Sequence, residues 1–117
     1  MLPTAVIIAL AVQAAATAAV PAERARPHHN LGAYVRGGDY PADALAERRT
    51  GVVHFELSVD ARGRVTGCRI TRSSGTPSLD AQSCRIMRQR ARFSPARDAR
   101  GGRVADVYPS RLGWMLQ

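Results

Sequence analysis

The clearest pattern in the chain is a strict alternation of apolar and polar positions from Gly51 to Val59. Such alternation predicts a β-strand with one buried face. Residues 60–63 (Asp-Ala-Arg-Gly) have the composition of a tight turn, and residues 64–72 are expected to return as a second strand. Gly67 interrupts the apolar pattern of this second strand and predicts a bulge. The buried face of the first strand is expected to hold Val53, Phe55, Leu57 and Val59.

A helix is predicted after Ser73-Ser74-Gly75, with Pro77 near its first position, where a missing N–H is tolerated. Apolar and small side chains gather on one arc of this helix, and arginines occupy the opposite arc. The first arc is expected to pack on the sheet. It contains Leu79, Ser83, Ile86, Met87 and Ala91, and the arginine arc contains Arg85, Arg88, Gln89 and Arg92.

A shorter helix is predicted over residues 39–49, with Pro41 in its first turn and Leu45 as its core contact. Residues 23–37 contain proline, histidines and glycines without periodicity, and they are interpreted as a linker. The order of elements is therefore helix, strand, strand, helix, strand.

The last strand is predicted over residues 103–116, and Pro109 lies near its middle. Because proline cannot donate to a sheet ladder, a strand that contains it normally lies at an edge. An unpaired edge can bind an extended segment of another protein through main-chain hydrogen bonds.

The first 22 of the 117 residues carry no charged side chain, and residues 5–20 are mostly apolar. Sixteen helical residues would span about 24 Å, which is short for a hydrocarbon core of about 30 Å. Residues 1–22 are interpreted as a secretory signal peptide that directs export of the protein. The alternative is an uncleaved signal anchor, and only in that form would the chain contact the membrane.

Two cysteines, Cys68 and Cys84, allow one intramolecular pairing. In an exported small domain, an even number of cysteines predicts a disulfide. The alternative is a pair of buried free thiols.

All 17 basic residues are arginines, and the formal net charge is +8. A solvated surface accounts for this charge, while a second hypothesis is a basic module that binds anionic polymers of the cell envelope. Nucleic acid is not expected as a partner, because few aromatic side chains are available for stacking. A third hypothesis is a homodimer formed through the same strand edge.

The sequence contains no phosphate-binding glycine loop, nucleophile elbow or metal-ligand spacing. No catalytic residue, cofactor or metal site is predicted, and the chain is not expected to be an enzyme.

The ordered motifs over residues 38–117 resemble the C-terminal domain of the TonB energy-transducer family. The matching residues are Tyr40-Pro41, Ala44, Gly51-Val52-Val53, Phe55, Val59-Asp60, Gly63-Arg64-Val65, Ser73-Ser74-Gly75, Leu79-Asp80, Phe93, Pro95-Ala96 and Tyr108-Pro109. The resemblance implies an α+β fold, similar to the C-terminal domains of TonB and TolA. In this fold a three-stranded antiparallel sheet packs on two helices.

The resemblance also implies a partner. Domains of this family are periplasmic and contact outer-membrane transporters, whose N-terminal TonB box pairs with the last strand. The transporter is thereby opened with energy from the inner membrane. The partner-binding residues carried over to this chain are Tyr40, Pro41, Val104, Ala105, Asp106, Val107, Tyr108, Arg111 and Leu112. A full transducer also has an anchor and a proline-rich spacer, so this chain is expected to bind without itself transmitting force.

Overall fold

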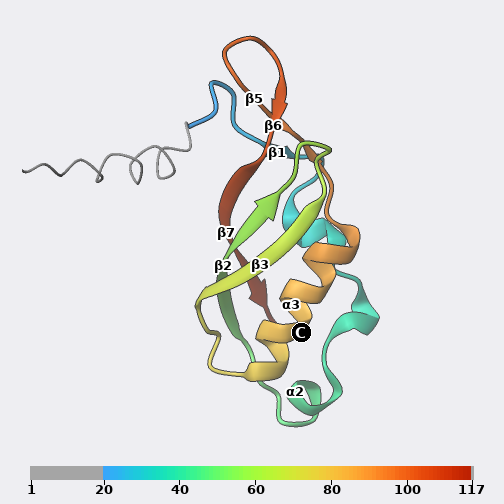
Figure 1. Ribbon diagram of the computed structural model, residues 1–117. Coiled ribbons are helices and arrows are strands. Elements are labelled where there is room, and N and C mark those ends of the chain that lie inside the picture. The colour runs from blue at the N-terminus through green and yellow to red at the C-terminus, as the bar shows by residue number, and fades with distance from the viewer. Residues whose placement is uncertain (1–19, 117) are drawn as a thin grey trace, which may run out of the picture.

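The computed structural model describes residues 20–116. Residues 1–19, which hold most of the predicted signal peptide, lie outside this part. A three-stranded antiparallel sheet has the order β3-β2-β7 and consists of β2 (Gly51–Val59), β3 (Val65–Arg72) and β7 (Asp106–Trp114). The helix α3 (Pro77–Arg90) crosses one face of this sheet, and α2 (Ala42–Ala46) lies at one end of the molecule (Figure 1). The predicted fold class is confirmed.

The hairpin of β2 and β3 follows the alternation of the sequence. The four residues on the apolar face of β2 are at most 1 % exposed, which confirms this face as the buried one. Ser58 pairs with Gly67 and Val59 with Val65, so one extra residue of β3, Thr66, has no partner in β2. The bulge thus lies beside Gly67, as predicted.

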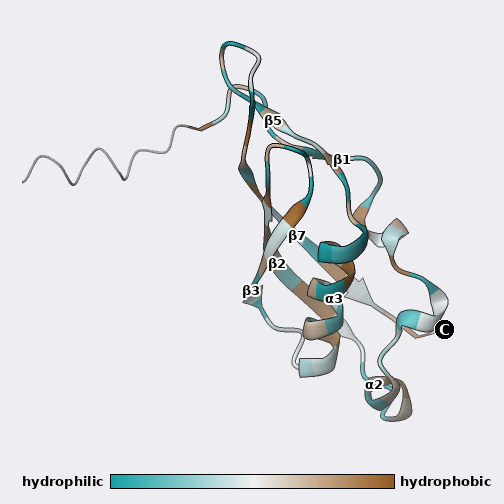
Figure 2. Ribbon diagram, turned by 45° about the vertical axis from the view of Figure 1, so that its right-hand side comes forward, coloured by the Kyte–Doolittle hydropathy of each residue, from teal (hydrophilic) through white to brown (hydrophobic). Residues whose placement is uncertain are grey.

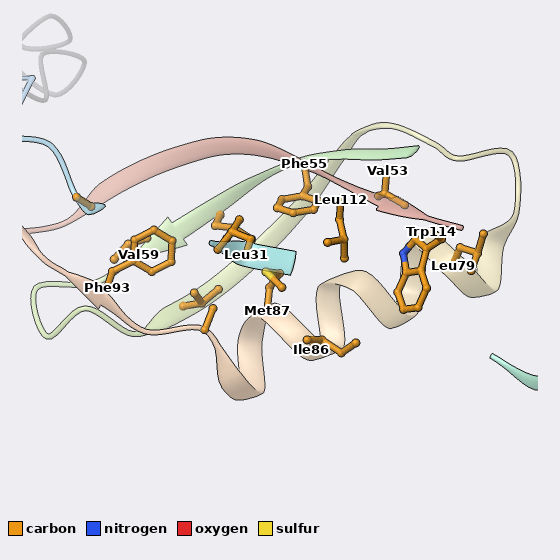
Figure 3. Packing of buried hydrophobic residues seen from close by; sticks show 14 of the residues in the cluster. Leu31, Val53, Phe55, Val59, Leu79, Ile86, Met87, Phe93, Leu112 and Trp114 are labelled. Carbon is orange, nitrogen blue, oxygen red and sulfur yellow. The ribbon is translucent and has the colours of Figure 1, made fainter. Parts of the chain in front are cut away.

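The apolar arc of α3 is buried against the sheet, as predicted. Its residues are at most 1 % exposed, and so is Ala91, which directly follows the helix. Figure 3 shows Met87 and Ile86 of α3 below Phe55 and Leu112 of the sheet. A disulfide joins Cys68 of β3 to Cys84 of α3 across a Cα–Cα distance of 5.5 Å, and the predicted pairing is therefore confirmed.

The last strand is shorter than predicted. Residues Arg103–Val104 form β6, which pairs with β5 (Ala96–Arg97) instead of continuing the sheet. Ala105 separates β6 from β7. The alternation of side chains continues through this break, so the apolar pattern alone did not show that the chain changes its partner strand.

Residues 23–37 do not form a free linker. They contain β1 (Arg26–Pro27), which pairs with β4 (Phe93–Ser94), and the short helix η1 (Leu31–Tyr34). Ala25 and Leu31 are 2 % and 5 % exposed and belong to the core. A two-residue strand and a single helical turn are too short to leave a periodic signal in the sequence.

The first helix is also shorter than expected, and Leu45 is not its core contact. A second short helix, η2 (Gly37–Asp39), precedes α2, and the left-handed backbone of Arg48 (φ 54°) turns the chain soon after α2 ends. With little more than one turn available, α2 buries Ala44 (1 % exposed) and leaves Leu45 52 % exposed. Within residues 20–116, no helix is long and apolar enough to cross a membrane.

Candidate protein-binding edge and groove

The strand β7 lies at one edge of the sheet. It pairs with β2 over nine residues, from Gly51–Trp114 to Val59–Asp106, and among residues 20–116 it has no second partner strand. Along β7, exposed positions alternate with partly or fully buried positions. The outer backbone side of β7 is therefore the place where another strand would add.

Two hydrogen bonds show which backbone groups of β7 point away from β2. The N–H of Val107 donates to Oδ1 of Asp106 (2.8 Å), and the carbonyl of Val107 accepts from Nη2 of Arg24 (3.2 Å). In an antiparallel strand, alternate residues direct both backbone groups to the same side. The backbone groups of Pro109, Arg111 and Gly113 therefore also point outward.

This alternation explains how β7 tolerates a proline. Pro109 is opposite Glu56 in β2, at a position where the backbone nitrogen points away from the ladder. The missing N–H of Pro109 thus removes no bond to β2, as expected for proline in an edge strand. Further along, Arg111 and Gly113 each carry an N–H and a carbonyl on the outer side.

The N-terminal end of β7 is closed by the segment that precedes β1. The guanidinium of Arg24 forms a bidentate pair with Asp106 (Nε–Oδ2 2.9 Å, Nη2–Oδ1 2.8 Å), and the N–H of Ala25 donates to Oδ2 (2.9 Å). The hydrogen bonds from Arg24 lower the pKa of Asp106. Both backbone groups of Val107 are therefore already bonded, and an incoming strand cannot use them without displacing Arg24.

The C-terminal end of β7 is supported by the core. Leu112 and Trp114 are 6 % and 3 % exposed, and both point from the sheet toward α3 (Figure 3). The indole N–H of Trp114 donates to Oγ of Ser83 in α3 (2.8 Å). The Tyr40 ring meets the Trp114 ring edge-on, with a centroid distance of 5.3 Å.

Tyr40 is held in this position by its own hydroxyl group and by the contacts of the preceding residue. Its hydroxyl donates to the carbonyl of Arg49. The preceding residue, Asp39, forms a bidentate pair with Arg90 of α3 (2.6 and 2.9 Å), and its carbonyl accepts from the Gln82 side chain (2.9 Å). The hydrogen bonds from Arg90 lower the pKa of Asp39 to about 2. The Tyr40 segment is thereby fastened to α3.

Between this segment and the end of β7 lies a groove of about 520 Å³. We call it the tyrosine groove. Its walls combine apolar side chains with one arginine and two glycines from the 32–37 segment. The lining residues are Gly32, Val35, Arg36, Gly37, Tyr40, Leu45, Leu112, Gly113, Trp114, Met115 and Leu116.

The predicted partner-binding residues do not all meet at this site. Tyr40 and Leu112 line the tyrosine groove, and Arg111 lies on the adjoining edge. Pro41 is the residue before α2 and lines a separate pocket of about 320 Å³ with Tyr40. Tyr108 packs edge-on against Phe93 (5.1 Å), on the inner side of the sheet.

Three further predicted residues lie at the closed end of the edge. Val104 belongs to β6, Ala105 precedes β7, and Asp106 already forms an ion pair with Arg24. Sequence reasoning missed Gly113, Trp114 and Met115, although the apolar spacing of Leu112 and Trp114 marked that end of the strand.

Comparison with protein families gives one match. The family described as "Gram-negative bacterial TonB protein C-terminal" matches residues 36–107, more than half of the chain. This chain belongs to the TonB C-terminal family. The match ends within β7, so the open end of that strand lies beyond it. No curated protein matches the chain.

Membership in the TonB C-terminal family defines the general context of the fold. The family comprises periplasmic, non-enzymatic domains associated with energy-coupled transport, and TonB C-terminal domains interact with outer-membrane transporters. The sheet edge and the tyrosine groove are the features of this TonB-like domain that have a geometry suited to such an interaction.

Proposed function

We propose that this TonB-like domain binds the TonB box of an outer-membrane transporter by strand addition along residues 109–114. The single observation that carries the proposal is the outer side of β7, where Arg111 and Gly113 present N–H and carbonyl groups next to the tyrosine groove. Main-chain hydrogen bonds supply affinity in this mode, and pockets for alternate side chains supply specificity.

The lining of the tyrosine groove defines the peptide that fits it. Exposed apolar side chains, among them Leu45 (52 % exposed) and Met115 (78 %), favour an apolar residue of the ligand. Arg36 in the groove and Arg111 on the edge favour an acidic residue nearby. We therefore expect a short extended segment that combines an apolar anchor with a carboxylate.

A proline at Arg111 tests the backbone contact directly. Arg111→Pro removes an outward N–H without removing a bond to β2, so we expect TonB-box peptide affinity to fall about tenfold or more. Arg111→Ala is the matched control, because it removes the same side chain and keeps the N–H. Peptide titrations followed by amide NMR shifts measure both affinities.

Equal affinities of Arg111→Pro and Arg111→Ala would contradict strand addition, as would shift changes confined to residues far from β7. A proline at Val107 is a poor substitute for this test. The Val107 N–H is internally bonded, so Val107→Pro would disturb the fold at the closed end.

Self-association through β7 is the competing use of the same edge. Strand addition to a transporter predicts a monomer that is saturated by one peptide. A homodimer predicts instead that the sedimentation coefficient rises with protein concentration and falls when peptide is added.

Export through a cleaved signal peptide remains a prediction of the sequence. Intact-mass measurement of the protein from the periplasmic fraction checks it. A mass that corresponds to loss of about the first 22 residues supports cleavage, and a chain that begins at Met1 contradicts it.

A further inference from the structure

A second pocket, of about 450 Å³, lies beyond the closed end of β7. In Figure 1 this region, with β1, β5 and β6, is at the opposite end of the molecule from α2. Five arginines and one glutamate from separate segments line it, and the two residues of β4 line it as well. We call it the basic pocket, and its charged residues are Glu23, Arg24, Arg26, Arg62, Arg97 and Arg103.

Among residues 20–116, most of the arginines in the basic pocket form no ion pair. Arg24 is neutralised by Asp106, whereas in residues 20–116 Arg26, Arg62 and Arg103 form no ion pair. Within the described part of the chain, the guanidinium of Arg97 donates only to the carbonyl of Gly101 (2.8 Å). One carboxylate, Glu23, therefore faces four arginines that Asp106 does not neutralise.

The backbone beneath these arginines is tightly connected. Glu23 and Arg97 exchange two main-chain hydrogen bonds (3.0 and 2.8 Å), which join the leading segment to β5. The turn that carries Arg62 is bonded to β4 through the N–H of Phe93 and the carbonyl of Gly63 (2.8 Å). The segments that carry Arg62, Arg97 and Glu23 are thus fixed relative to one another before any ligand binds.

Gly63 shows how close this approach is. Its backbone is left-handed (φ 82°), and a Cβ atom at this position would lie 1.9 Å from the carbonyl oxygen of Phe93. Only glycine fits there, so the hairpin turn and β4 meet in direct backbone contact. Arg62 is consequently held next to β4, and it lines the same pocket as the arginines of β1 and β6.

We propose that the basic pocket binds a phosphate group. Guanidinium groups form forked hydrogen bonds with phosphate oxygens and keep their charge at every physiological pH. A tetrahedral phosphate offers oxygens in several directions, which suits arginines that converge from β1, the hairpin turn and β6. A single planar carboxylate would engage fewer of these arginines at once.

The phosphate can come from a soluble molecule or from a phospholipid headgroup at a membrane surface. Arg24 and Arg26 come shortly after the mostly apolar residues 5–20. In Figure 2 the ribbon around β5 and β1 is coloured mainly teal and white, with little hydrophobic colour. The recognition chemistry is the same in both cases, and the two sources are separated by experiment.

The test compares two triple variants of the full chain. Arg26→Gln/Arg62→Gln/Arg103→Gln removes three of the four arginines of the basic pocket that Asp106 does not neutralise. Arg72→Gln/Arg85→Gln/Arg88→Gln removes three exposed arginines of β3 and α3, and it lowers the net charge by the same amount. Binding of pyrophosphate is measured by calorimetry, and vesicles of phosphatidylglycerol or phosphatidylcholine are used in sedimentation.

We expect the pocket variant to lose about tenfold or more in affinity for pyrophosphate, for phosphatidylglycerol vesicles, or for both, while the control variant changes about twofold or less. A loss confined to vesicles identifies the headgroup as the source, and a loss confined to pyrophosphate identifies a soluble phosphate. Equal losses in the two variants would mean that only net charge matters, and this would overturn the proposal. The proposal would also be overturned if the unaltered chain bound neither pyrophosphate nor the vesicles.

Discussion

The two ends of β7 belong to one strand and pair with one neighbour, yet they differ in what lies outside them. At the N-terminal end, Asp106 and Arg24 occupy the outward backbone groups of Val107. At the C-terminal end, Arg111 and Gly113 lie beside the tyrosine groove. An edge strand is therefore not uniformly open, and the neighbouring segments decide how much of it a ligand can use.

The two ends also differ in how they are stabilised. The open end rests on buried apolar side chains, of which Trp114 is the largest, whereas the closed end is held by hydrogen bonds and by one ion pair between the exposed Arg24 and the buried carboxylate of Asp106. Packing that is largely independent of solvent supports the end of the edge at which we propose that a partner binds. Polar contacts, which pH alters, cover the edge that is not offered.

The largest effect is expected for Trp114→Ala. This change removes a buried ring that packs against Tyr40 and bonds Ser83, so the free energy of unfolding should fall by about 3–5 kcal/mol. Trp114→Phe, which keeps most of the ring and loses the N–H, should cost about 1–2 kcal/mol. Urea unfolding measures both values, and a loss below about 1 kcal/mol for Trp114→Ala would show that the open end does not depend on this packing.

The next largest effect is expected when the disulfide is removed, and it should be the same for both ends of β7. The disulfide joins α3 to β3, the strand at the other edge of the sheet. The double variant Cys68→Ser/Cys84→Ser should lower the free energy of unfolding by about 3 kcal/mol. Because the bond lies away from β7, amide shifts of β7 should keep their wild-type pattern. A selective change at one end of β7 would contradict this separation.

Asp106→Ala tests the closed end. The change removes the acceptor for Arg24, Ala25 and Val107, and we expect a loss of about 1–3 kcal/mol in the free energy of unfolding. It also exposes the backbone of Val107, so the footprint of a TonB-box peptide should extend to that residue. Glu56→Ala, which breaks the surface pair with Arg69, is the control and should cost less than about 1 kcal/mol. An unchanged footprint would mean that Arg24 does not limit the edge.

The smallest effect is a dependence of stability on acid pH. The pKa of Asp39 is lowered from 3.8 to about 2 by Arg90, and the pKa of Asp106 is lowered by Arg24. A lowered pKa in the folded state means that the unfolded state takes up the proton first. The stabilisation is therefore complete above the ordinary pKa of 3.8 and is lost as the pH falls toward 2.

Urea unfolding between neutral and acid pH checks this dependence. Asp39→Asn should flatten the slope and loosen the Tyr40 segment, whereas Asp106→Asn should flatten it and loosen the segment before β1. If neither variant changed the slope, other carboxylates would have to account for it.

The predictions from sequence were most accurate where an element with a long periodic pattern of apolar residues packs against one continuous surface within the domain. The β2 strand, the buried arc of α3 and the edge position of the strand containing Pro109 are of this kind. The candidate site was predicted less completely. Of the residues predicted to bind a partner, Tyr40 and Leu112 line the groove and Arg111 lies beside it, but Leu45 was assigned to the core and Val104 to the edge.

These errors have a common physical cause. Local pattern reports which side of an element is apolar, and it does not report how many turns an element has or which strand it pairs with. Ala44 replaces Leu45 in the core because α2 has little more than one turn, and Val104 leaves the edge because β6 pairs with β5.

The sequence by itself determined the order of the main elements, the buried face of β2 and the family, and it predicted the disulfide, since each depends on spacing or on local composition. Only the tertiary structure decided that Arg24 and Ala25 cover one end of β7 and that the tyrosine groove forms at the other. Both depend on contacts between residues far apart in the chain, such as Arg24 with Asp106 and Tyr40 with Trp114. No local pattern encodes such contacts, because they exist only when the sheet and α3 have brought the two segments together.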